Sequence, residues 1–170
     1  MFIDESGFYL LPALLRTYAP IAETPVLSVP LTRDHLSVIG ALSASGKLCM
    51  QVKHKALTSL DVIGFLRHVL RHIPGRLLLV WDGSPIHRSR QVKAFLQAEG
   101  AQRLFIERLP GYAPDLNPKE GVWRHLKRVE LKNVCCQDTQ HLKQHLRRAK
   151  ERLRHKRHIL QACFLHAGAV

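Results

Sequence analysis

The sequence is poor in acidic residues, in paired cysteine motifs and in long hydrophobic runs, and each shortage excludes a class of protein. No apolar run approaches the roughly 20 residues that a membrane-spanning helix needs. The amino terminus has no basic segment followed by a long apolar stretch, so no export signal is visible. The four cysteines, Cys49, Cys135, Cys136 and Cys163, form no Cys-x-x-Cys pair. We interpret them as buried or free thiols, not zinc ligands, in a cytoplasmic protein without membrane association.

Basic residues, by contrast, are abundant. Lys and Arg total 26 against 13 Asp and Glu, a formal charge of +13 with the 11 histidines neutral. A field of this sign attracts polyanions, and nucleic acid is the most common of these. The composition therefore favours a nucleic-acid-binding protein over a merely soluble basic one.

The charge is concentrated in residues 139–158, where apolar residues recur at helical spacing. Leu142, Leu146 and Leu153 would lie on one face of a long basic helix that packs on the rest of the domain. Glu151 is the only acidic residue in this stretch. We expect the helix to contact DNA phosphates without sequence preference, although a passive solvated surface is the alternative. The predicted contacts are Lys143, Arg147, Arg148, Lys150, Arg152 and Arg154.

The order of the predicted elements indicates an α/β fold. At 170 residues the chain has room for one domain, spanning residues 1–170, with a real hydrophobic core. A short strand at 1–5 is followed by a hairpin of strands at 35–42 and 47–54, and by a helix that begins at Thr58 with a capping box. Further elements are a buried strand at 77–81, a helix at 86–99, a strand at 103–107 and a helix after Asn117. This order is that of a ribonuclease-H-like mixed five-stranded sheet flanked by helices.

Three acidic residues follow stiff elements. FIDESGF is an apolar strand that runs into Asp4, and RLLLVWDGSPIHRS is a longer one that runs into Asp82. LPGYAPDLNPKEGVWRHLK is a proline-rich loop that starts a helix with Glu120 in its first turn. Because sites in α/β sheets gather where strands end, we expect these carboxylates to form one metal site.

Each acid also has a structural explanation. Asp4 could be an ordinary exposed acid, and Asp82 could simply form the Asp-Gly-Ser-Pro turn. Glu120 occupies the position of a capping-box acid behind Asn117, and it could pair with Arg124 one turn later. Three such explanations in separate segments are less probable than one shared site.

The neighbours of these acids receive weaker predictions. Glu5 would point to the opposite face of a continuing strand, so we expect it to be structural, and we interpret Asp115 as a loop or cap residue. His87 follows Asp82 at the predicted start of a helix, where free N–H groups could bind a phosphate. It is either an active-site neighbour or a surface histidine. Trp81 and Trp123 are expected in the core.

Five blocks in this order resemble the catalytic domain of DDE transposases, and in particular the bacterial insertion-sequence relatives of the mariner superfamily. The blocks are FIDESGF, RTYAPIAETPVL, LSVIGALSASGKL, LLLVWDGSPIHRSRQVKAFL and LPGYAPDLNPKEGVWRHLKR. The resemblance implies that Asp4, Asp82 and Glu120 are the catalytic triad and bind two Mg²⁺ or Mn²⁺ ions. Residues 83–119, thirty-seven in number, separate the second acid from the third, which fits the short spacer of that family.

The resemblance also implies a function. It predicts metal-dependent cleavage and strand transfer on transposon ends and target DNA by a homodimer that is associated with the nucleoid. Relatives carry a helix-turn-helix region before the first aspartate, and only three residues precede Asp4 here. The alternative is therefore a truncated, non-catalytic DNA-binding remnant that regulates transposition.

Overall fold

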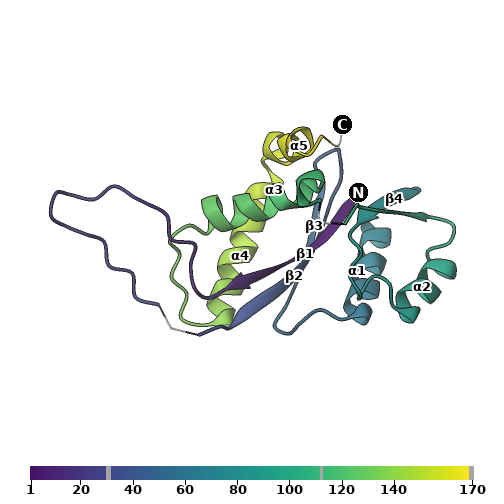
Figure 1. Cartoon of the computed structure of the whole chain (residues 1–170), viewed down its shortest axis with the longest axis horizontal. Helices are drawn as coiled ribbons and strands as arrows, with labels where there is room; N and C mark the ends of the chain where they lie inside the picture. Colours follow the sequence, from purple (N-terminus) through teal and green to yellow (C-terminus); the bar gives the residue numbers. More distant parts are fainter. Residues whose placement is uncertain (30–31, 112, 169–170) are drawn as a thin grey trace.

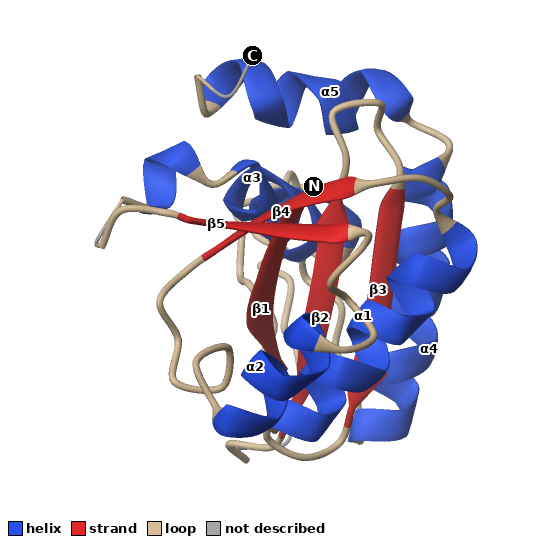
Figure 2. Ribbon diagram, turned by 90° about the vertical axis from the view of Figure 1, so that its right-hand side faces the viewer, coloured by secondary structure: helices blue, strands red, loops and turns tan. Residues whose placement is uncertain are grey.

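A mixed five-stranded sheet with helices on both faces forms the framework of the chain (Figures 1 and 2). The structure is a computed structural model that describes residues 1–29, 32–111 and 113–168. The strand order is β3-β2-β1-β4-β5. The strands are β1 (Phe2–Tyr9), β2 (His35–Leu42), β3 (Leu48–Lys53), β4 (Leu77–Trp81) and β5 (Leu104–Arg108). The first three strands are antiparallel, whereas β4 runs parallel to β1 and β5 parallel to β4. This arrangement confirms the predicted ribonuclease-H-like fold class.

Two groups of helices cover the two faces of the sheet, as Figure 1 shows. The helices are α1 (Ser59–His72), α2 (Arg90–Gln97), α3 (Pro118–His125), α4 (Thr139–Arg154) and α5 (Arg157–His166), and a π-helical turn, η2 (Leu126–Glu130), extends α3. Apolar side chains of α1 and α2 form one core with Ile3, Ile39 and Leu79 of the sheet. Those of α3, α4 and α5 form a second core with Phe8 and Val38. Alternate residues of β1, β2 and β3 therefore serve different cores, whereas β4 and β5 contribute only to the first.

Local sequence signals account for several boundaries. Thr58 accepts a hydrogen bond from the N–H of Asp61, and the Asp61 carboxylate accepts one from the N–H of Thr58, which confirms the capping box. The predicted hairpin and the buried strand of residues 77–81 are also confirmed.

No helix in the described ranges is both long and apolar enough to cross a membrane.

Three predicted boundaries were wrong. Strand β1 continues to Tyr9 because it pairs along its whole length with β2, so Asp4 lies inside the strand and not at its end. Helix α2 begins at Arg90, after Ser89 caps it by accepting a hydrogen bond from Val92 N–H. The basic helix, predicted to run over residues 139–158, ends at Arg154. The next helix, α5, begins three residues later.

A close approach between the sheet and α3 occurs at Gly40 of β2. Lys119, in the first turn of α3, is completely buried there, and its Nζ lies 3.7 Å from the centroid of the Trp123 ring. A Cβ atom on Gly40 would lie 2.6 Å from Lys119 Nζ and 3.0 Å from the Trp123 ring. Glycine at this position therefore sets how closely α3 can pack on β2.

Replacing Gly40 by alanine should destabilise the fold. The added methyl group has no space beside a buried lysine and a buried indole, and such overpacking costs typically about 1–3 kcal/mol. Gly64→Ala is the matched control, because Gly64 is exposed within α1 and nothing lies within 4 Å of its added Cβ. That change should stabilise the protein by roughly 0.5–1 kcal/mol. Urea unfolding of both variants measures the difference, and equal stabilities would contradict the close packing.

Candidate active site

Asp4 is fixed by two hydrogen bonds on the face of the sheet that α3 covers. Its Oδ2 accepts a hydrogen bond of 2.9 Å from Trp123 Nε1, and its Oδ1 accepts one of 2.9 Å from the N–H of Glu5. Asp4 is partly buried between β1 and α3. The alternative explanation from the sequence, that it is an ordinary exposed acid, is therefore wrong. Trp123 is in the core, as predicted, but its N–H also orients the carboxylate.

The environment of Asp4 disfavours its negative charge. Burial is the main cause that raises its pKa to about 6, against the hydrogen bond from Trp123, and repulsion from Glu120 and Glu5 raises it further. Asp4 and Glu120, far apart in the sequence, therefore lie within electrostatic range of each other. A cation bound here would relieve this accumulation of negative charge.

Asp82 follows β4 directly, beside β1. Phe2 pairs with Val80 in the parallel ladder, and Asp4 and Asp82 each lie two residues beyond this pair. The Asp82 carboxylate is half exposed and accepts a hydrogen bond of 2.9 Å from the N–H of Ser84. Asp82 therefore stabilises a turn, as one of the two explanations from the sequence proposed. It also lies at the point where the parallel strands β1 and β4 separate.

His87 connects Asp82 to Glu5. Its Nδ1 lies 3.0 Å from Asp82 Oδ1, its Nε2 lies 2.9 Å from Glu5 Oε1, and its ring stacks on Trp81 with centroids 4.4 Å apart. The residue is only 3% exposed, so the surface-histidine alternative is wrong. It lies in the turn before α2, not at the start of that helix. The ligand atoms of Glu5, Asp82 and His87 lie within 4.8 Å of one another, a spacing that could hold a metal ion.

The two carboxylates favour the charged form of His87. Burial acts against the imidazolium, but the hydrogen bond to Glu5 and the charges of Glu5 and Asp82 outweigh it and raise the pKa of His87. Glu5 was predicted to point to the opposite face of the strand from Asp4. Its contact with His87, on the side of the sheet that α1 and α2 cover, confirms this orientation. Its role as a partner of His87 was missed, because the two residues are 82 positions apart in the sequence.

Glu120 is exposed in the first turn of α3. The N–H of its capping residue Asn117 donates to the carbonyl of Pro114, so it does not bond to the Glu120 carboxylate, and the capping-box explanation is wrong. The Asn117 side chain caps the helix by accepting from the N–H of Lys119. Within the described residues the Glu120 carboxylate forms neither a hydrogen bond nor an ion pair, with Arg124 or any other group. Its oxygens are available to an external ligand.

Two lysines flank Asp4, and the sequence interpretation missed both. Burial lowers the pKa of Lys119 to about 7, and Asp4 partly counteracts this. Lys127 donates a hydrogen bond of 2.8 Å to Ser6 Oγ, and its pKa is lowered by burial against attraction from Glu120 and Asp4. The signal was present, because Lys119, Trp123 and Lys127 recur every four residues and so share one helix face.

The three predicted acids do not form one tight cluster. Asp4 and Glu120 interact electrostatically, while Asp82 is turned to His87, and the ligand atoms of the three are not all within 4.8 Å of one another. A groove beside α3 and α5 is lined by Glu120 and by basic side chains, including Arg124, Lys127 and Arg128, but not by Asp4 or Asp82. The arrangement is thus an acidic centre with a basic groove that begins at Glu120.

Comparison with known proteins identifies relatives of this arrangement. The family of DDE superfamily endonucleases matches residues 1–143. The chain also resembles the mariner Mos1 paired-end complex with Mg, at a TM-score of 0.64 and 18% identity, over 98% of this chain and 55% of that one. The catalytic domain of Mos1 mariner transposase matches at a TM-score of 0.55 and 16% identity, over 98% of this chain and 82% of that one.

At these identities the structural likeness concerns the fold. The chain spans about 55% of the length of the Mos1 chains in the paired-end complexes. No curated protein shows significant sequence similarity to it.

The raised pKa of Asp4 predicts a pH-dependent stability. Its folded value of about 6 lies above its ordinary value of 3.8, so protonated Asp4 stabilises the fold fully below about pH 4, and this contribution is lost as the pH rises through 6. Asp4→Asn stays neutral, but its one amide oxygen can accept from Trp123 or from Glu5 and not from both, so at pH 7.5 it should be more stable than the parent by less than roughly 3 kcal/mol, at about 1.4 kcal/mol per pKa unit.

Urea unfolding between pH 4 and 8 measures this difference, which should vanish at pH 4. Asp115→Asn, which alters an exposed acid before the same helix, should change nothing at either pH. An Asp4→Asn variant that is destabilised at every pH would show that the ionised carboxylate is a net stabilising partner of the nearby lysines.

Proposed function

Because the chain belongs to the family of DDE superfamily endonucleases, we propose that it is the catalytic domain of a DNA transposase. It would cleave and transfer DNA strands with Asp4, Asp82 and Glu120 as the catalytic and metal-binding residues. The observation that carries this proposal is the position of Asp4: it lies beside β4, which Asp82 directly follows, and within electrostatic range of Glu120. Three acids from separate parts of the sequence thus border one region of a strongly basic chain.

The donor set suits hard divalent cations. Carboxylate oxygens are the ligands that Mg²⁺ and Mn²⁺ prefer, and Glu120 offers oxygens without a protein partner in the described structure. Two ions bound by Asp4, Asp82 and Glu120 would supply activation of the attacking oxygen and stabilisation of the leaving oxygen. Acids that hold different ions of such a pair need not lie within 4.8 Å of one another. A Mos1 structure with Mg and another with Mn support the choice of metal.

Neighbouring side chains would position these acids. Trp123 holds Asp4 through its N–H, and His87 holds Asp82 while it binds Glu5 on the other face of the sheet. Lys127, bonded to Ser6, is within electrostatic range of both Asp4 and Glu120. It would attract an incoming phosphate to the acids.

The proposed partners are transposon ends and target DNA, which the chain would meet at the nucleoid in the cytoplasm as a homodimer. Relatives in this fold include a Mos1 paired-end complex with a transposon end and a Mos1 strand transfer complex, which supports DNA as the partner.

Not all cations of α4 are equally available to DNA. Arg152 forms an ion pair with Glu130, and Lys150 and Arg154 pair with Glu151. Arg147 and Arg148 are exposed and have no carboxylate partner among the described residues. Of the six predicted phosphate contacts, these two and Lys143 are the ones that a phosphate could bind without displacing an acid.

The catalytic proposal predicts that single carboxylate changes abolish cleavage. With Mg²⁺ or Mn²⁺ the chain should nick DNA, and Asp82→Asn should lower the rate by at least the roughly 10²–10³-fold that removal of one strong electrostatic interaction costs. Glu120→Gln should lower it similarly without loss of stability. Asp115→Asn, an acid that lines the same groove as Glu120, is the control and should cleave normally.

Gel assays of nicking and of DNA binding separate the two candidate functions. Unaltered cleavage by Glu120→Gln would exclude the triad. A parent chain that binds DNA but shows no metal-dependent nicking would favour the alternative of a non-catalytic regulator.

The basic helix predicts a steep salt dependence of DNA binding. Each neutralised phosphate contributes about −0.9 to the slope of log affinity against log salt concentration. Arg147→Ala with Arg148→Ala should flatten the slope by about 0.9 for each phosphate that is no longer neutralised. Arg71→Ala with Arg76→Ala is the matched control. Both side chains are exposed and Arg71 belongs to α1, which covers the opposite face of the sheet from α4, so this change should leave the slope nearly unaltered. Identical slopes for both double variants would make α4 a passive surface.

A further inference from the structure

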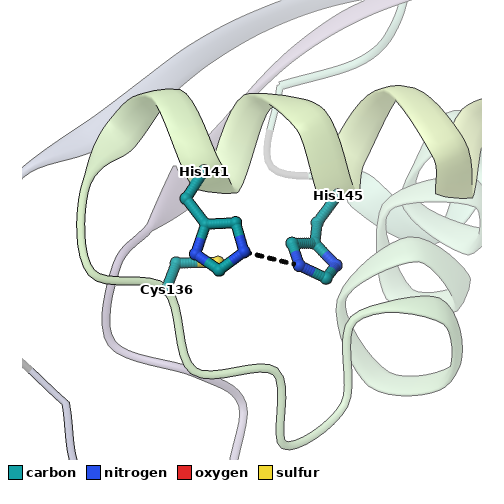
Figure 3. A group of neighbouring side chains, drawn as sticks. All are labelled: Cys136, His141 and His145. Carbon is teal, nitrogen blue, oxygen red and sulfur yellow. Dashed lines mark hydrogen bonds between the residues drawn. The ribbon is translucent and has the colours of Figure 1, made fainter.

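A second group of metal-ligating side chains lies at the start of α4, apart from the acids. Cys136 precedes the helix, and His141 and His145 project from its first two turns towards the same space (Figure 3). The sulfur and one nitrogen of each ring all lie within 4.8 Å of one another. Two of the ligands come from one rigid helix, and the third comes from the segment that leads into it.

The helix itself brings the two imidazoles together. Asp138 caps α4 by accepting a hydrogen bond of 2.7 Å from the N–H of His141, and residues four apart lie on the same helix face. The Nε2 atoms of His141 and His145 are 3.0 Å apart. Two nitrogens bound to one zinc ion at about 2.0–2.1 Å in tetrahedral geometry lie roughly 3.3 Å apart. Small side-chain rotations would therefore admit an ion between them.

The chemical states of the side chains also suit a metal. A neutral imidazole donates a ring-nitrogen lone pair to a metal ion, and a thiol that coordinates a metal ion is deprotonated by it. Cys136 is completely buried, which shields such a bond from solvent and oxidants.

We propose that Cys136, His141 and His145 bind one Zn²⁺ ion at a structural site. Thiolate and imidazole are preferred zinc ligands, and water would complete a tetrahedral site, whereas Mg²⁺ prefers oxygen ligands. Binding would release the thiol proton, and the imidazole that donates from its Nε2 to the other ring would carry its proton on Nδ1 instead, so that both neutral rings could bind the ion through Nε2. The lack of a Cys-x-x-Cys pair argued against zinc in the sequence, but this site needs only one thiol beside a pair of histidines.

The position of the site suggests what the ion would do. Residues 131–138 connect the η2 turn, which extends α3, to the basic helix α4. An ion held by Cys136 and by two turns of α4 would fasten this connection and so fix α4 relative to the helix that carries Glu120. The site goes beyond the proposed nuclease function and uses none of its acids.

Zinc binding by the purified full chain, measured with Mg²⁺ in excess, tests the proposal. We expect one zinc per chain, a rise in melting temperature on zinc addition, and a thiolate-to-metal charge-transfer band when Co²⁺ replaces zinc. His145→Gln and Cys136→Ser should each weaken zinc affinity by at least about 10-fold and remove the zinc-dependent rise in melting temperature. The His145→Gln variant should fold normally, because glutamine is a good helix former and His145 is not in the core. A loss of zinc affinity in this variant would therefore not result from misfolding.

The chain offers a matched control for the histidine pair. His68 and His72 have the same spacing on α1, with ring centroids 4.2 Å apart, but no cysteine joins them among the metal-ligating groups of the described residues. His68→Gln with His72→Gln, and separately Cys163→Ser, should leave zinc affinity unchanged. Less than stoichiometric zinc, unaltered affinity in both site variants, or an equal loss in the controls would overturn the proposal. None of these readouts depends on DNA cleavage.

Discussion

The hydrogen bond from Trp123 to Asp4 is the contact on which the rest of the acidic site depends. It joins the central strand β1 to α3, two elements that are 119 residues apart in the sequence at this point. Gly40 permits the approach, because a larger residue would collide with Lys119 and Trp123. Once α3 lies here, Glu120 in its first turn is held near Asp4, and Lys127 one turn after Trp123 reaches Ser6 of β1.

Charge inside the protein is balanced locally, although the chain as a whole is strongly basic. His87 lies between Glu5 and Asp82, and Lys119 and Lys127 lie near Asp4. For His87 the acidic partners outweigh the desolvation cost of the charged form, whereas for Lys119 and Lys127 the opposite charges offset that cost only in part. Lys119 shows the imbalance most clearly, since its Nζ has no hydrogen-bond partner among the described residues. Buried ionisable groups with incompletely offset desolvation energies are typical of functional sites and not of sites that serve stability alone.

The sequence predicted the fold better than it predicted the site. The capping box at Thr58, the continuous apolar run of residues 77–81 and the hairpin are local signals, and the structure follows them. The end of β1 depends on pairing with β2, which no local pattern reveals, so Asp4 was expected at a strand end. Contacts such as Glu5 with His87 and Trp123 with Asp4 require the tertiary fold, whereas the spacing of Lys119, Trp123 and Lys127 was visible but unused.

Asp82 contacts both the turn that follows β4 and the ring of His87. Its Oδ1 accepts from Ser84 N–H and lies beside His87, and the hydrogen bond to Glu5 with the charges of Glu5 and Asp82 raises the pKa of His87. A cation that bound Asp82 through Oδ1 would compete with the His87 ring for that oxygen. Because Glu5 would still bind His87 from the opposite side of the sheet, the imidazole would stay in place, and Asp82 could move without loss of the ring's stacking on Trp81. The Glu5–His87 pair would thus keep the imidazole in place if Asp82 exchanged its contact with the ring for one with a cation.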